Sequence, residues 1–121
     1  MENLSNRSTE DVLEDHLRLR TAGDVENDLA RNFAPDVVVM TPKGMRKGHE
    51  AVRRFNKMLQ AHVPRHYVFP AKLTSGRFAF IEWRAREPGR SVEDGADSFV
   101  IENGKIVFQS IHYSLQETMP G

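Results

Sequence analysis

One carboxylate in this sequence falls among apolar side chains, in a stretch whose pattern is typical of a β-strand. Successive side chains of an extended chain point to opposite faces, so Asp97, Phe99 and Ile101 share one face. An acid on an apolar face is explained by an ion pair with an arginine, by capping of the loop after Gly95, or by a functional site. Asp97 is therefore our first candidate for a functional residue, and these explanations stay open.

A histidine occupies a comparable position on a predicted helix. His16 has the helical spacing of Val12, Leu13 and Leu17 and shares their apolar face. An imidazole can donate a hydrogen bond and can also exchange a proton near neutral pH. His16 is a second candidate for chemistry, beside the simpler explanation of a partly buried histidine whose hydrogen bonds are satisfied.

The strand predicted over residues 78–86 allows two orientations, and each places different side chains toward the helices. If Phe80 faces inward, Glu82 and Arg84 face inward too and could act as a charged pair. The opposite register turns Ile81 and Trp83 inward and leaves the charged residues on the outer face. The apolar pair favours the second register, and Trp83 is expected as a pocket wall or an interface anchor in either.

Three helices are expected to position these residues. Ser8 is an N-cap followed by acids and Gly23 is a C-terminal glycine, which predicts a helix ending near Ala22. A second, short helix is expected over residues 25–33. A third runs from Gly48 to the proline at position 64.

The rest of the chain is predicted to form strands. The β-branched residues 37–39 indicate the first strand, and four more are expected over residues 67–74, 78–86, 97–102 and 106–113. Asn103-Gly104 predicts a two-residue antiparallel hairpin, because both residues tolerate positive φ. The polar segment from Glu87 to Gly95 predicts a loop, either mobile or lying over a cavity mouth.

Composition limits the possible functions. The 121 residues suit one domain over residues 8–116, with flexible ends at 1–7 and 117–121, and 17 basic residues balance 17 acidic ones. This balance gives no reason to expect a nucleic acid or a membrane as partner. Without cysteine, a signal sequence or metal-ligand histidine spacing, we expect a cytoplasmic protein with neither metal nor cofactor.

The order of helix, helix, strand, helix and antiparallel meander resembles the nuclear transport factor 2-like superfamily, which includes ketosteroid isomerases and SnoaL-like polyketide cyclases. The matching segments are residues 22–24, 29–37, 48–52 and 97–106. The resemblance implies a cone-shaped α+β fold in which three N-terminal helices pack on a strongly curved antiparallel sheet with a mixed edge. Helices and sheet would enclose a pocket for a small apolar or cyclic ligand.

The resemblance also suggests roles for individual residues. Asp97 lies where ketosteroid isomerases carry a protonated aspartic acid that donates a hydrogen bond to a developing oxyanion. The oxyanion tyrosine of those enzymes corresponds to His16 here. Their general base, an aspartate before a proline, corresponds to Thr41 before Pro42, and threonine cannot be that base.

Three functions follow from the resemblance. The first is an isomerase, cyclase or lyase that uses acid/base chemistry through Asp97, with His16 or Tyr113. The second is a ligand-binding or dimeric interaction module without chemistry. The third is an epoxide hydrolase-like enzyme in which Glu82, Arg84 and Asp97 activate water.

The same comparison predicts the pocket lining and a dimer interface. The expected lining residues are Thr41, Phe55, Phe80, Trp83, Phe99, Ile101, Gln109, Ile111 and Tyr113. On the last strand, Phe108, Ser110 and His112 would face outward. A homodimer through that outer sheet face is therefore expected.

Overall fold

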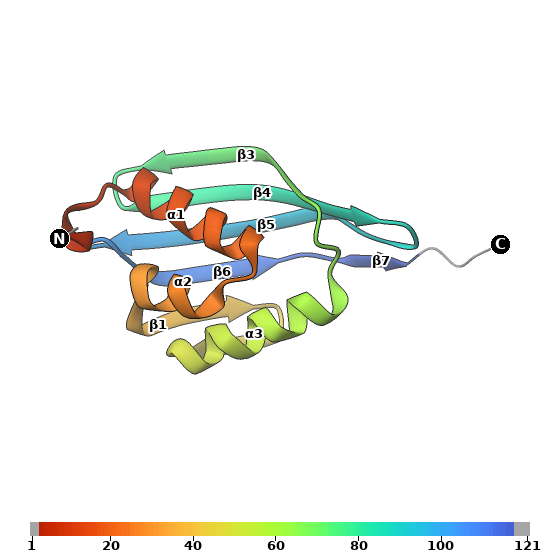
Figure 1. Cartoon of the computed structure of the whole chain (residues 1–121), viewed down its shortest axis with the longest axis horizontal. Helices are drawn as coiled ribbons and strands as arrows, with labels where there is room; N and C mark the ends of the chain where they lie inside the picture. The colour runs from red at the N-terminus through yellow and green to blue at the C-terminus, as the bar shows by residue number, and fades with distance from the viewer. Residues whose placement is uncertain (1–2, 118–121) are drawn as a thin grey trace.

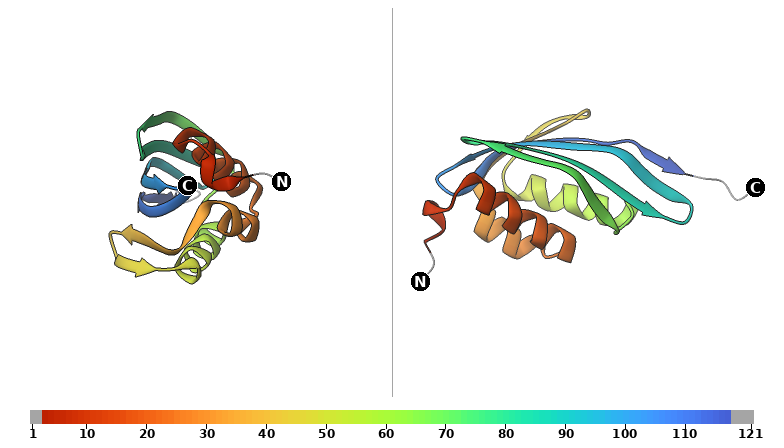
Figure 2. Two further views of the ribbon diagram at one scale, coloured as in Figure 1. Left: turned by 90° about the vertical axis from the view of Figure 1, so that its left-hand side faces the viewer. Right: turned by 90° about the horizontal axis from the view of Figure 1, so that it is seen from above.

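The computed structural model describes residues 3–117 and consists of one curved sheet with three helices on its concave side (Figures 1 and 2). The helices are α1 (Thr9–Ala22), α2 (Val25–Asn32) and α3 (His49–His62), preceded by a 3-10 turn, η1 (Leu4–Asn6). The strands are β1 (Phe33–Thr41), β2 (Gly44–Lys47), β3 (Tyr67–Ser75), β4 (Phe78–Glu87), β5 (Arg90–Glu102), β6 (Lys105–His112) and β7 (Leu115–Glu117). This arrangement confirms the predicted α+β class.

Local signals in the sequence explain where the helices begin and end. The Ser8 side chain accepts a hydrogen bond from the Asp11 backbone N–H at 3.0 Å and caps α1. Gly23 adopts a left-handed conformation with φ 74° and ends the helix. Asp24 then caps α2 by accepting from the Asn27 backbone N–H at 3.3 Å. The predicted boundaries of α1 are therefore confirmed.

The sheet is mixed and open, with the strand order β2-β1-β6-β5-β4-β3, and β7 pairs with the first part of β5. β1 and β6 run parallel, and the other neighbours are antiparallel. The parallel pair lies inside the sheet, because β2 adds a short hairpin strand outside β1. The sequence does not predict β2, because its four residues are all exposed and carry no core pattern.

The curvature of the sheet has a visible cause in β4 and β5. Their register shifts after Trp83, which lies opposite Gly95. A Cβ atom at Gly95 would lie 2.3 Å from the Trp83 ring, so only glycine lets the indole cross this strand. The shift bends the long hairpin, and the right-hand view of Figure 2 shows the sheet arching over the helices.

The prediction of a loop from Glu87 to Gly95 is wrong. β5 begins at Arg90, and only Pro88 and Gly89 form the turn between β4 and β5. The polar residues of β5 in this stretch are mostly half-buried, and Val92 is its fully buried apolar residue. A single apolar residue gave no alternation from which a strand could be predicted.

Part of the N-terminal segment that was expected to be flexible contacts the rest of the fold. The Arg7 guanidinium donates to the backbone oxygens of Leu4 at 3.2 Å, Arg31 at 2.7 Å and Gly104 at 2.9 Å. Residues 3–7 therefore pack against α2 and the β5–β6 turn. Residues 1–2 and 118–121, where the remaining flexible ends were expected, lie outside the described residues.

The core fills the space between the concave face and the helices. Its buried members from the helices include Val12, Leu13, Leu17, Leu29, Val52 and Leu59, and those from the sheet include Phe33, Val37, Ile81, Trp83, Phe99, Ile101, Ile106 and Ile111. Each large apolar side chain buried in this way contributes about 1.5–3 kcal/mol to folding. In the described part of the chain, no helix has the length and apolar character needed to cross a membrane.

Candidate functional site

A small cavity lies between α1, α3 and the concave face of the sheet, and we call it the central cavity. Its volume is about 20 Å³, which is room for roughly one water molecule. It is lined by His16, Arg20, Phe33, Val39, Val52, Phe55, Asn56, Leu59, Trp83, Asp97, Gln109 and Ile111. The cavity is smaller than the expected pocket for a cyclic ligand, and apolar side chains from β1 and α3 make up much of its lining.

Asp97 points into the central cavity from β5. Its side chain is 5% exposed, and its strand position pairs with Ile81 of β4 on the concave face. Trp83 Nε1 donates to one carboxyl oxygen at 3.0 Å, and Gln109 Nε2 donates to the other at 3.1 Å. The ion pair considered for Asp97 is absent from the described residues, where its hydrogen-bond donors are neutral.

Burial raises the pKa of Asp97, and this effect exceeds the opposing effects of the Trp83 and Gln109 hydrogen bonds and of the Arg20 charge. A protonated carboxyl group can keep both observed acceptor contacts, because each oxygen has more than one lone pair. Its hydroxyl proton is then available to a group in the cavity. Asp97 can therefore act as a neutral hydrogen-bond donor.

His16 reaches the same cavity from α1 and is 2% exposed. Its Nδ1 atom lies 2.8 Å from a carboxyl oxygen of Asp28 on α2. The rings of Phe33 and Phe99 pack edge-on against the imidazole, with centroid distances of 5.3 and 5.5 Å. The other ring nitrogen, Nε2, is buried and has no hydrogen-bond partner in the described part of the chain.

The contact with Asp28 determines which nitrogen of His16 holds the proton. The second oxygen of Asp28 accepts from Asn32 Nδ2 at 2.9 Å, so the carboxylate acts as an acceptor on both sides. Donation from Nδ1 of His16 to Asp28 selects the tautomer in which Nε2 of a neutral imidazole keeps a free lone pair. Such a nitrogen can accept a proton from a bound molecule.

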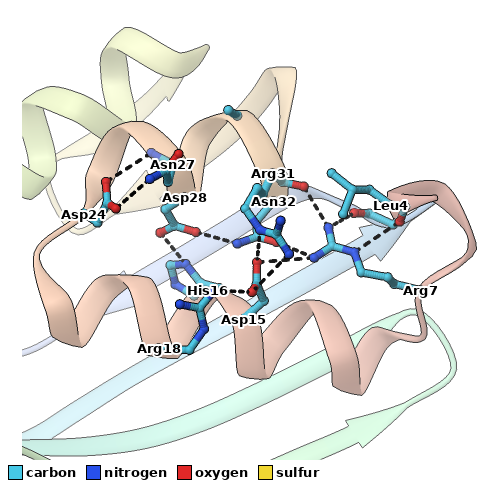
Figure 3. Close-up of polar contacts among 12 residues, drawn as sticks. Leu4, Arg7, Asp15, His16, Arg18, Asp24, Asn27, Asp28, Arg31 and Asn32 are labelled. Carbon is cyan, nitrogen blue, oxygen red and sulfur yellow. Dashed lines mark hydrogen bonds and ion pairs between the residues drawn. The ribbon is translucent and has the colours of Figure 1, made fainter. Parts of the chain in front are cut away.

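A chain of polar contacts holds Asp28 in place (Figure 3). Asn32 donates to Asp28, and Arg7 donates to the Asn32 side-chain oxygen at 2.8 Å. Arg7 is fixed in turn by the backbone oxygen of Gly104, at 2.9 Å. The orientation of His16 therefore depends on residues from the N-terminal segment, α2 and the turn between β5 and β6.

Asp15 anchors the same chain from α1. It forms ion pairs with Arg7 at 3.4 Å, Arg18 at 2.7 Å and Arg31 at 2.9 Å. Burial alone would raise its pKa, but hydrogen bonds from Arg31, Arg18 and Asn32 hold the pKa well below its usual range. Asp15 therefore stays ionised and keeps Arg7 beside Asn32.

Arg20 and Asn56 also line the cavity, although neither was expected to do so. Arg20 lies one helical turn after His16, so the spacing of four residues was a usable signal for a shared face. Its guanidinium donates to Asn56 Oδ1 at 3.3 Å and to the Tyr67 hydroxyl at 3.1 Å. These contacts join α1 to α3 and β3 beside the cavity.

Glu82 and Arg84 lie outside the site. The structure has the second of the two registers: Ile81 and Trp83 are buried, and the two charged residues are exposed on the outer face. Phe80 shares that outer face and does not line the central cavity. The water-activating cluster with Asp97 is therefore not formed, because adjacent strand residues point to opposite sides.

The other expected lining residues divide into two groups. Four line the central cavity: Phe55, Trp83, Gln109 and Ile111. The rest lie elsewhere. Phe99 and Ile101 are in the core, Tyr113 packs beside Trp83 with ring centroids 5.7 Å apart, and Thr41 accepts from the Lys43 backbone N–H at the β1–β2 turn.

Metal chemistry has no support in this site. Within residues 3–117, no three side chains of the metal-binding types His, Cys, Asp and Glu gather closely enough to hold an ion. The polar groups of the cavity instead suit proton transfer and hydrogen bonding. A basic nitrogen on α1 and a carboxyl group with a raised pKa on β5 face the same small space.

Comparison with known proteins gives one family and a common fold. The family model described as the SnoaL-like domain matches residues 13–109. Among curated proteins, no significant match exists.

Solved structures of similar shape are numerous, at low sequence identity. A candidate ketosteroid isomerase from Kribbella flavida has a TM-score of 0.74 at 17% identity, over 93% of this chain and 83% of its own. A candidate polyketide cyclase from Sinorhizobium meliloti has a TM-score of 0.65 at 24% identity, over 84% and 93%. A de novo designed protein with a curved β-sheet reaches 0.75 at 20% identity, over 94% and 88%. These likenesses show the fold alone, and the designed protein shows that the fold can exist without a natural function.

Proposed function

The chain belongs to the SnoaL-like domain family, and on that premise we propose that it is a cofactor-independent enzyme that moves a proton on a small cyclic or lipophilic molecule. One observation carries this proposal. The buried Nε2 atom of His16 has no hydrogen-bond partner among residues 3–117, and His16 and Asp97 both line the central cavity. An unpartnered buried nitrogen costs folding free energy, which a role in ligand chemistry explains.

In the proposed reaction, Nε2 of His16 takes a proton from a carbon next to a carbonyl group. The electron pair of the broken C–H bond moves onto the carbonyl oxygen and forms an enolate. Asp28 stabilises the imidazolium, and the protonated carboxyl group of Asp97 donates a hydrogen bond to the enolate oxygen.

The outcome of the reaction depends on what the enolate does next. Return of the proton from His16 to another carbon gives an isomerase. Attack of the enolate carbon on a second carbonyl group closes a ring, as in a cyclase, and loss of a group from the neighbouring carbon gives a lyase. The neighbouring structures described as a candidate isomerase and a candidate cyclase agree with this range.

The proposed base, His16, lies at a different position from the base of the ketosteroid isomerases. In the ketosteroid isomerases that the chain resembles, the base corresponds to Thr41, which here only closes a turn. His16 was expected as a hydrogen-bond donor by the same comparison. Its contact with Asp28 instead favours the role of base, while Asp97 keeps the role of donor.

Binding of a small ligand without turnover is a second candidate function. The cavity volume of about 20 Å³ favours it, because a cyclic substrate fits only after side chains such as Phe55 move. Phe55 is half-buried on α3 and is the most accessible apolar lining residue. This function would be identified by a molecule that binds to the protein and is released without any chemical change.

Exchange of carbon-bound hydrogen in D2O tests the proposed enzyme directly. The protein is incubated with a panel of small cyclic ketones and unsaturated ketones, and loss of the C–H signals is followed by NMR. We expect exchange with the wild-type protein and a loss of about 100-fold or more in His16→Gln, the size of a general-base contribution.

His66→Gln is the matched control, because His66 is exposed and lies outside the cavity. It should exchange hydrogen at the wild-type rate. A His16→Gln protein that folds and exchanges hydrogen as fast as the wild type excludes His16 as the base.

A further inference from the structure

Arg20 is the cationic side chain among the lining residues of the central cavity. It is half-buried, and within residues 3–117 its guanidinium contacts neutral groups: Asn56 Oδ1 at 3.3 Å, the Tyr67 hydroxyl at 3.1 Å and the Tyr67 ring, 5.1 Å from its centroid. A guanidinium withdrawn from water without a counter-ion is unfavourable, since neutral partners compensate its charge only in part.

The other half-buried arginines of the described chain form ion pairs with carboxylates. Arg7 and Arg31 pair with Asp15, Arg53 pairs with two glutamates, and Arg90 pairs with Glu87. Within residues 3–117, Arg20 alone of these five has no carboxylate at ion-pair distance. The fold thus pairs its half-buried guanidinium groups, and the exception is the one that faces the cavity.

Asp97 does not provide the missing counter-ion. Both of its carboxyl oxygens accept from other groups, Trp83 Nε1 and Gln109 Nε2, and Arg20 donates to neither. Burial raises the pKa of Asp97 in spite of the positive charge of Arg20. The cavity is therefore lined by one guanidinium group that has no carboxylate oxygen at hydrogen-bond distance among residues 3–117, beside Asp97 and His16.

We propose that the molecule bound in the central cavity carries a carboxylate, and that Arg20 is the residue that selects it. This inference rests on the proposed proton-transfer site and names its substrate class. The planar guanidinium matches a carboxylate in geometry and can donate two parallel hydrogen bonds to it. Asn56, which is buried, holds the guanidinium from the α3 side through its side-chain oxygen.

The position of Arg20 also limits the distance between the carboxylate and the reacting carbon. Residues four apart on a helix have Cβ atoms about 5–6 Å apart on the same face. Because Arg20 and His16 both line the same small cavity, a molecule held there by Arg20 presents to His16 a carbon only a few bonds from its carboxylate. The substrate class is a small carboxylic acid whose carbonyl group and acidic C–H lie near the carboxylate, such as an oxo acid.

Binding of matched anionic and neutral probes tests this inference. The probes are acetate against acetamide and benzoate against benzamide, which differ in charge far more than in shape, measured by calorimetry with the full chain at about pH 7. We expect at least one carboxylate to bind about tenfold or more tightly than its amide, the size of a charge-assisted contact. Arg20→Met should lose this preference, and Arg20→Lys should keep part of it.

Arg46→Met is the control, because Arg46 is exposed on β2 and does not line the cavity. It should bind the carboxylate as the wild type does. The inference is overturned if neither carboxylate binds more tightly than its amide, or if folded Arg20→Met keeps the preference.

The two proposals fail in different ways. In one outcome, carboxylate binding depends on Arg20, but the protein exchanges hydrogen on no small oxo acid or ketone. This outcome rules out the proton-transfer function and supports the anion site. In the other outcome, the protein exchanges hydrogen on neutral ketones in a way that depends on His16, but it shows no preference for carboxylates. This outcome rules out the proposed role of Arg20 and supports the proton-transfer function.

Discussion

At the scale of single residues, the Asp97 carboxyl group connects burial with chemistry. Its two oxygens accept from Trp83 and Gln109, but both donors are neutral and give less compensation than an arginine would. Burial therefore favours the protonated form of Asp97 more in the folded protein than in the unfolded chain. The same property that makes Asp97 a possible donor to an enolate oxygen has a measurable effect on stability.

Asp97→Asn should change stability in a pH-dependent way. The pKa of Asp97 is raised in the folded state, so its contribution is fully present below the unfolded pKa and is lost as the pH rises through the folded pKa. Asparagine does not titrate. Compared with the wild type, the variant should gain stability as the pH increases.

Unfolding by urea at a series of pH values from about pH 4 to about pH 8 measures this difference in unfolding free energy. Gln109 can turn its amide to pair with asparagine, so the variant is expected to fold. A difference that stays constant over this range means that Asp97 is ionised in the folded protein as it is in the unfolded chain.

The sequence predicts some of these residues and misses others for a physical reason. Strand alternation predicts the shared face of Asp97, Phe99 and Ile101, because that rule is local. The partner of His16 could not be predicted in this way. Asp28 lies twelve residues away on another helix, and only the packing of α1 on α2 brings the two together.

At the scale of secondary-structure elements, the bend in β4 and β5 determines the shape of the concave face. Trp83 crosses β5 at Gly95 and donates to Asp97, so one indole ring links the curvature of the sheet to the site. The sequence predicts the hairpin at Asn103-Gly104, where turn chemistry is specific, and Asn103 indeed has a positive φ of 51°. The extent of β5 before Gly95 could not be predicted, because its pairing with β4 is set by tertiary contacts.

Gly95→Ala tests the link between bend and site. The added methyl group would lie 2.3 Å from the Trp83 ring and 2.7 Å from its backbone oxygen, so we expect a loss of about 1–3 kcal/mol of stability from overpacking. Urea unfolding measures this loss.

Trp83→Leu provides the matched background, because the smaller side chain removes much of the overlap. The loss from Gly95→Ala should be smaller there than in the wild type, which is the coupling expected between residues in contact. Equal losses in both backgrounds would show that the Trp83 ring does not require a glycine at position 95.

At the scale of the whole molecule, one side of the sheet is covered by helices and the other is not (Figure 2). Outward-facing residues of the central strands include Phe80, Val100 and Phe108, which are half-buried, and Phe78 at the start of β4 is 54% exposed. Apolar side chains on an uncovered sheet face commonly mark an interface. The outward direction expected for Phe108, Ser110 and His112 agrees with the alternating burial of β6.

We propose a homodimer through this outer face. Sedimentation at micromolar concentration should give about twice the 13.8 kDa of the chain, and Phe108→Glu should give the monomer mass, because a charge in an apolar interface is unfavourable. A wild-type mass near 13.8 kDa at that concentration contradicts the proposal.

The proposed proton transfer requires that Nε2 of His16 is unprotonated, so that it can accept a proton. Nitrogen-15 NMR of the histidine side chains reports directly which ring nitrogen is protonated. At neutral pH, we expect Nδ1 of His16 to carry the proton and Nε2 to be unprotonated, and Asp28→Asn should disturb this state, whereas Asp36→Asn at an exposed position should not. A neutral His16 with its proton on Nε2 in the wild-type protein would contradict its role as the base.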